Sequence, residues 1–123
     1  MNNFSFSLGW KIRSGIPYTN ALGIGTNNNR TRIIYDKIND QRLPTYQRLD
    51  FSPTFKFKFS KTNKVTGKIG VSLMNVFNKR NILDRKYELK FVNTTLGSEE
   101  LKLVETDKIS IGFTPNVVFR VTF

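Results

Sequence analysis

The chain contains no cysteine and no histidine, and alanine occurs only once, at Ala21. The lack of cysteine excludes disulfides, thiolate zinc sites and catalytic thiols, and the lack of histidine excludes imidazole ligands and every catalytic triad that needs an imidazole base. There is also no run of about 18 apolar residues that could cross a membrane as a helix. We therefore expect no enzymatic activity, no catalytic residues, no cofactor and no metal site.

Acidic residues are scarce, because 9 Asp and Glu residues stand against 20 Lys and Arg residues, giving a formal net charge of +11 at pH 7. Such an excess usually indicates nucleic acid, anionic lipid or an acidic ligand as partner. Residues 1–7 have no basic n-region, no apolar h-region and no cleavage site, so they do not form a secretory signal. If the chain belongs in a membrane, it must cross it as strands.

Phenylalanine is abundant, with 11 residues, and aromatic and β-branched residues favour strands. Apolar and polar residues alternate over four stretches, which places them on opposite faces of a strand. The apolar positions are Phe4, Phe6, Leu8, Trp10 and Ile12; Leu49, Phe51, Pro53, Phe55, Phe57 and Phe59; Ile69, Val71 and Leu73; and the odd positions from Ile109 to Phe123. The longest stretches exceed the usual soluble strand of about 5–6 residues and fit the roughly 9–11 residues of a membrane strand.

The connections between these stretches are residues 14–45, 60–66 and 79–108. Their order of long, short and long matches the short periplasmic turns and long extracellular loops of outer-membrane barrels, and it predicts a periplasmic C-terminus. A hairpin formed by residues 87–92 and 101–104 is expected to extend the third and fourth strands, and a bulge is expected over residues 75–78. The predicted fold is all-β, an antiparallel meander of about four long strands that forms a fragment of a transmembrane β-barrel in the bacterial outer membrane.

Aromatic residues near the strand ends match the girdles that flank the apolar band of such barrels. Trp10 and Tyr46 are expected to face lipid near the outer rim. Phe59 is expected to face lipid at the periplasmic rim, together with Phe4 and Phe123. Trp10, Tyr46 and Phe59 are therefore predicted as lipid-facing girdle residues.

Four segments in order span nearly the whole chain: Trp10 with residues 13–19, residues 42–51, residues 75–81, and residues 113–123. These segments resemble the TonB-dependent outer-membrane receptors, especially those of Bacteroidetes-type bacteria. The resemblance implies a barrel closed around an N-terminal plug, which takes up iron chelates, cobalamin, glycans or peptides with energy relayed by TonB. Residues 1–123 are then expected to be the C-terminal part of the barrel, without the plug and the earlier strands, because four strands cannot close a transmembrane barrel.

The C-terminal strand carries Val117, Phe119, Val121 and the terminal aromatic residue Phe123. This ending resembles the signal that the barrel-assembly machinery recognises in outer-membrane proteins. The implied partners are this machinery, the remainder of the barrel and the plug, TonB through the plug, and outer-membrane lipid and lipopolysaccharide. No ligand-binding residues are assigned, because specificity is expected to come from loops and plug.

The alternative is a small basic soluble β-domain that binds nucleic acid or another polyanion. Residues 56–59 alternate lysine and phenylalanine, and cations with stacking aromatics are what single-stranded nucleic acid needs. On a strand, however, the lysines and phenylalanines point to opposite faces, so nucleic acid is not expected as a partner. The polar residues Arg48 and Asp50 are interpreted as an ion pair in a polar lumen, with contact to a plug or a ligand as the alternative. The carboxylates of residues 99–107 lack the spacing of a calcium loop and are interpreted as solvated.

Overall fold

The computed structural model describes residues 3–59 and 65–123, and these residues form strands and turns but no helix. The predicted all-β class is therefore confirmed. The strands are β1 (Asn3–Arg13), β2 (Pro17–Tyr18), β3 (Ala21–Asn27), β4 (Arg30–Tyr35), β5 (Gln41–Arg42), β6 (Tyr46–Lys58), β7 (Thr66–Met74), β8 (Ile82–Asn93), β9 (Glu99–Ile109) and β10 (Thr114–Thr122). In the described part of the chain, no helix is long and apolar enough to span a membrane.

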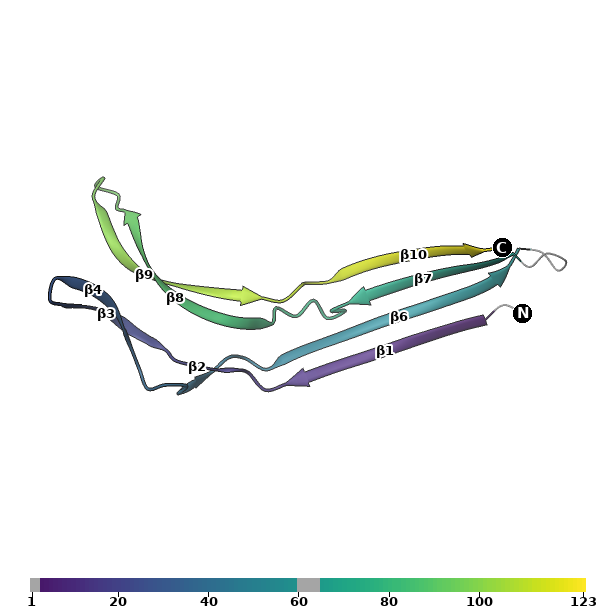
Figure 1. Cartoon of the computed structure of the whole chain (residues 1–123), viewed down its shortest axis with the longest axis horizontal. Helices are drawn as coiled ribbons and strands as arrows, with labels where there is room; N and C mark the ends of the chain where they lie inside the picture. Colours follow the sequence, from purple (N-terminus) through teal and green to yellow (C-terminus); the bar gives the residue numbers. More distant parts are fainter. Residues whose placement is uncertain (1–2, 60–64) are drawn as a thin grey trace. The chain divides into compact units, whose positions relative to one another are not determined.

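The strands belong to two compact units. Residues 1–13, 46–80 and 111–123 form the first unit, and residues 14–45 and 81–110 form the second. The first unit is a four-stranded sheet in the order β1-β6-β7-β10, in which every neighbouring pair is antiparallel (Figure 1). The four long strands thus lie side by side in the order in which the chain forms them. This confirms the predicted antiparallel meander.

Pro53 lies in the middle of β6, where a residue without an N–H interrupts a hydrogen-bonded ladder. Toward β1 the pairing of β6 is continuous, and Pro53 lies opposite Phe6. Toward β7 the pairing is interrupted at Ser52 and Pro53. There the Ser52 hydroxyl donates to the Ser72 hydroxyl oxygen at 3.1 Å, so a side-chain bond joins the strands where the ladder is open. Pro115 lies on β10, an edge strand of the described sheet, where proline is tolerated.

The fourth long strand is shorter than the alternation predicts. The apolar pattern continues from Ile109 to Phe123, but β9 ends at Ile109 and β10 begins only at Thr114. Between them the backbone is bound by asparagine side chains: Asn75 Nδ2 donates to Ile111 O at 3.0 Å, and Phe113 N donates to Asn78 Oδ1 at 2.9 Å.

The bulge expected over residues 75–78 is also wrong. β7 ends at Met74, and a turn follows in which Asn75 and Asn78 have φ angles of 52° and 48°. Asparagine tolerates this left-handed conformation better than most residues. The break in the alternation therefore marks the end of the strand.

The second unit contains two hairpins. Residues 14–45 were expected to form only a loop, but β3 and β4 pair across a two-residue turn at Asn28 and Asn29, whose φ angles are 49° and 60°. Two consecutive left-handed residues form the type I′ turn that suits a tight hairpin. The hairpin expected in the last connection is confirmed as β8 paired with β9. It forms its own two-stranded sheet, separate from the sheet that contains β7 and β10.

The described residues bury very little apolar surface. Leu43, in the second unit, is the one buried apolar side chain among them, at 5% exposure. Its backbone N donates to Ile16 O at 3.0 Å, and a Cβ at Gly15 would collide with the Leu43 carbonyl oxygen. Gly15 is therefore needed for this close approach of two backbones. No apolar side chain in the described part of the four-stranded sheet is buried.

Candidate functional site: a two-faced antiparallel sheet

One face of the four-stranded sheet is apolar across all of its strands. The register places Phe4, Phe55, Ile69 and Phe119 opposite one another in a single row. Among the described residues of β1, β6, β7 and β10, this face carries no charged side chain, and Gln47 is its one polar side chain. The face is exposed on β1 and β10 and mostly half-buried on β6 and β7, and a contiguous apolar surface of this kind normally contacts lipid or another protein.

Aromatic rings are concentrated where β6 ends. Phe57 stacks with Phe55 at 5.9 Å between ring centroids and meets Phe59 edge-on at 5.0 Å. Phe57 also covers Gly67 on β7, because a Cβ at Gly67 would lie 2.5 Å from the Phe57 ring. Phe59, one of the predicted girdle residues, is exposed and lies at the same end of the sheet as Phe123.

The other two predicted girdle residues lie on opposite faces. Trp10 shares the apolar face with Leu49, its partner on β6, and is exposed. Tyr46 lies opposite Arg13 on the polar face, where the Arg13 guanidinium carbon is 4.6 Å from the centre of the Tyr46 ring. The expectation that Tyr46 faces the same surface as Trp10 is therefore wrong. The apolar set of β6 occupies odd positions, and Tyr46 is an even one.

The C-terminal strand β10 presents the residues of the predicted assembly signal. Val117, Phe119 and Val121 share its apolar face and are exposed, and Phe123 follows the strand with 93% of its surface exposed. In the described sheet β10 pairs only with β7, so its other edge offers free N–H and C=O groups. Such an edge can accept another strand.

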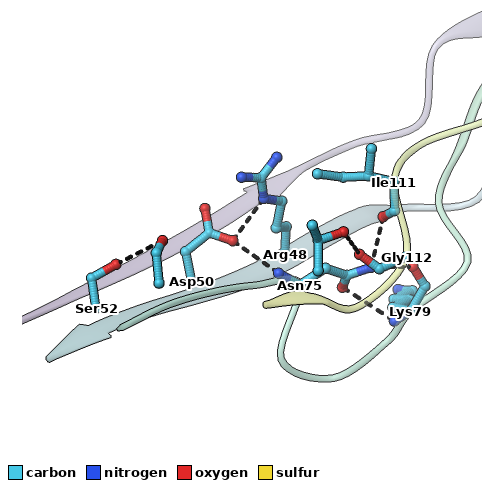
Figure 2. Close-up of polar contacts among 9 residues, drawn as sticks. Arg48, Asp50, Ser52, Asn75, Lys79, Ile111 and Gly112 are labelled. Carbon is cyan, nitrogen blue, oxygen red and sulfur yellow. Dashed lines mark hydrogen bonds and ion pairs between the residues drawn. The ribbon is translucent and has the colours of Figure 1, made fainter. Parts of the chain in front are cut away.

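Asn75 joins three separate parts of the first unit (Figure 2). Its side chain is fully buried at 0% exposure, and its amide Nδ2 donates to Lys79 O and to Ile111 O, both at 3.0 Å. Its Oδ1 accepts from Lys79 N at 3.2 Å. Its backbone N donates to Asp50 Oδ1 on β6 at 3.0 Å. We call residues 75–78 the Asn75 turn; it connects the end of β7 to β6 and to the segment before β10.

Arg48 completes this arrangement from the polar face of β6. Its Nε donates to Asp50 Oδ1 at 2.7 Å, so the carboxylate binds both the guanidinium and the backbone of the Asn75 turn (Figure 2). The predicted pairing of Arg48 with Asp50 is confirmed. The role of Asn75 was missed, although the polar residues that interrupt the alternation after Met74 were a signal that something other than a strand is built there.

Arg85 organises the second unit. Its guanidinium forms a bidentate pair with Asp107 at 2.7 and 3.0 Å, contacts Glu105 at 3.1 Å, and donates from Nη1 to the Tyr18 hydroxyl at 3.2 Å. The hydrogen bond with Asp107 raises the pKa of Arg85. These contacts join the β8–β9 hairpin to residues 14–45. The N–H groups of Arg85 that make these contacts bind other residues of the chain. The Arg85 cluster therefore stabilises the fold of the second unit and is not an open anion-binding site.

Tyr87 makes a second tie between the same segments. Its hydroxyl donates to Asn20 Oδ1 at 2.8 Å, and its ring meets Tyr35 edge-on at 6.4 Å. Burial raises the pKa of the Tyr87 hydroxyl, and the negative charge of Glu105 adds to this rise. The hydroxyl therefore keeps its proton, and its role as a donor, to higher pH than an ordinary tyrosine.

Within residues 3–59 and 65–123, no three carboxylates lie close enough together to hold a metal ion. Comparison with known proteins gives no match, either to a protein-family model, to a curated protein or to a solved structure.

Proposed function

We propose that the chain forms the C-terminal strands of an outer-membrane β-barrel, as part of a TonB-dependent receptor for energy-coupled nutrient uptake. The observation that carries the proposal is the apolar face of the sheet. It is uncharged and continuous over four strands of 9 to 13 residues, exposed on β1 and β10 and mostly half-buried on β6 and β7, and no second layer covers it among the described residues of the first unit. A tilted strand of about 9–11 residues crosses the hydrocarbon core of a bilayer.

Lipid explains this face better than the interior of a soluble domain. A soluble sheet buries its apolar face against a second layer of structure, and the described residues of the first unit include no such layer. The opposite face is polar, as expected for the lumen of a barrel. The free edges of β1 and β10 then pair with earlier strands of the same barrel, because open sheet edges do not occur in lipid.

The assignment to the receptor family is supported by the way its sequence segments come together. Arg48 and Asp50, from the second segment, bind the backbone of Asn75, from the third. Asn78, also from the third, binds Phe113 at the start of the fourth. Three of the four segments that carry the resemblance thus build one connected structure. The chain is accordingly proposed to be non-enzymatic, with the plug, the rest of the barrel, TonB and the assembly machinery as its partners.

Removal of the terminal aromatic side chain tests this proposal. Phe123→Ala, introduced into the gene in its native host, is expected to lower the outer-membrane level of the protein several-fold and to leave protease-sensitive chains in the periplasm. The reason is that the proposed assembly signal ends in an aromatic residue on a free strand edge. Quantitative blotting of separated outer-membrane and periplasmic fractions measures the effect.

Leu96→Ala is the matched control, because Leu96 is 95% exposed, about as exposed as Phe123, but lies in the turn between β8 and β9. It is expected to leave the outer-membrane level unchanged. The protein that still assembles with Phe123→Ala is expected to keep its heat-resistant mobility in detergent gels, since only a rim side chain is lost. Equal outer-membrane levels of the two variants, or recovery of the unaltered protein in the soluble fraction, contradict the proposal.

A further inference from the structure

The positive charge of the chain is concentrated in one of the two units. The segments of the first unit contain eleven Lys and Arg residues and a single carboxylate, Asp50, whereas those of the second contain nine Lys and Arg residues and eight carboxylates. The first unit therefore carries ten of the eleven net positive charges. Asp50 already accepts hydrogen bonds from Arg48 and from the backbone of Asn75, so it does not neutralise the other cations.

Three of these cations lie directly opposite one another on the polar face. Lys68 on β7 has Lys56 on β6 as its partner on one side and Arg120 on β10 on the other. Lys58 lies two residues beyond Lys56 on the same face. Like charges directly opposite each other destabilise a sheet. We call Lys56, Lys58, Lys68 and Arg120 the cation row. In the described residues, no ion pair joins any of the four to a carboxylate.

The cation row lines an open groove of about 410 Å³. The other polar side chains in its wall are Asn3, Thr66 and Thr122, which offer amide and hydroxyl groups, and no carboxylate lines it. The groove has the size of a small-molecule site rather than a protein interface. Phe57 is the one aromatic residue among the described residues that line the groove, so the groove offers no run of stacked aromatic rings for nucleobases.

We propose that this groove binds a small ligand that carries two or more phosphate groups. Lysine ammonium groups act as point charges for phosphate, and arginine can bind phosphate with two parallel hydrogen bonds. Two strand spacings, about 10 Å, separate the outer members of the row, so the cations can engage more than one phosphate at a time. Binding places negative charge between like charges and removes the repulsion that the empty row causes. The site is built only from the polar face. The proposed binding is therefore the same whether the apolar face contacts lipid or protein.

Pyrophosphate binding to the full 123-residue chain in a non-ionic detergent tests the site. Isothermal titration is expected to show saturable binding, and pyrophosphate is expected to raise the melting temperature of the strand signal in circular dichroism more than sodium chloride of equal ionic strength does. Lys68→Gln is expected to weaken binding about tenfold, because the central charge of the row is lost. The same variant is expected to melt higher than the unaltered chain when no phosphate is present.

Lys108→Gln is the matched control, since it removes one lysine from a strand of the second unit, and it is expected to leave pyrophosphate binding unchanged. Arg120→Gln, at the exposed end of the row, provides a second variant should Lys68→Gln fail to show the strand signal. Equal loss of binding in the Lys68 and Lys108 variants overturns the proposal. So does the lack of any melting shift beyond that of sodium chloride, or binding of polyglutamate without binding of pyrophosphate.

A competition experiment distinguishes the two possible sources of the phosphate groups, a lipid headgroup and a soluble compound. If the ligand is a lipid headgroup, bicelles that contain cardiolipin, which carries two phosphate groups, are expected to displace pyrophosphate, whereas bicelles of phosphatidylcholine alone are not. If the ligand is a soluble phosphate compound, neither kind of bicelle displaces it. Both results support the same phosphate-binding chemistry at the cation row and assign it to one of the two sources.

Discussion

Replacing Val117 with arginine is expected to destabilise the membrane-inserted protein by about 2–4 kcal/mol, the cost of a charged side chain at a lipid-facing position near the bilayer midplane. Val117 lies on the apolar face of β10, opposite Val71, and is 70% exposed. The same substitution at the next residue, Val118, is expected to cost about 1 kcal/mol or less, because Val118 faces the polar side and lies opposite Gly70.

This pair is closely matched. The two positions are neighbours on one strand, have the same native side chain, and are both exposed in the described sheet, with Val118 at 53%. Thr114→Arg, also on the polar face of β10, provides a second control and is expected to behave like Val118→Arg. Urea unfolding from bilayers, followed by tryptophan fluorescence of Trp10, measures the differences. Equal costs at Val117 and Val118 would count in favour of a soluble sheet and against lipid contact.

Loss of the Asn75 side chain is expected to lower the free energy of unfolding about as much as Val117→Arg does. Asn75→Gly removes three hydrogen bonds from a fully buried position but keeps the left-handed backbone accessible, and it is expected to cost about 3 kcal/mol. Asn75→Ala adds the strain of a positive φ at a residue with a Cβ, which is worth roughly 1–2 kcal/mol more.

Asn39 provides the control, because it has a φ of 57° on the exposed surface of the second unit. Asn39→Ala is expected to cost about 1 kcal/mol, the backbone strain alone. Chemical denaturation of the chain in detergent, followed by circular dichroism, gives the three free energies of unfolding. If Asn75→Gly proves as stable as the unaltered chain, the Asn75 side chain does not hold the end of β7 to the segment before β10.

The faces of the long strands were predictable because alternation is a local property of the sequence. Each apolar side chain expected on one face of β1, β6, β7 and β10 lies there. The exception within these strands is Tyr46, which was assigned by its aromatic character and not by its position. Its even number placed it with Arg48 and Asp50 from the start, and the register with Arg13 bears this out.

Strand ends were less predictable, because they depend on partners far away in the chain. The alternation from Ile109 to Phe123 continues through residues 110–113, but Ile111 and Phe113 form hydrogen bonds with Asn75 and Asn78, more than 30 residues earlier. The β3–β4 hairpin was missed for a different reason. Its signal is local, because Asn28 and Asn29 stand between two short runs, but a polar, asparagine-rich stretch is equally typical of a simple loop.

The cation row could not be found from composition. The sequence shows an excess of eleven positive charges, but it does not show that ten of them belong to one unit. That follows only when the topology brings residues 1–13, 46–80 and 111–123 into one sheet. The direct opposition of Lys56, Lys68 and Arg120 likewise depends on the register of three strands.

The most direct test of the central claim is a map of which side chains of β10 touch lipid. The chain has no native cysteine, so single cysteines at positions 116 to 119 can each carry one spin label. In outer membranes, labels at Val117 and Phe119 are expected to collide with oxygen more than with a water-soluble nickel complex. Labels at Asn116 and Val118 are expected to show the reverse. Contact with the nickel complex at all four positions would contradict the account.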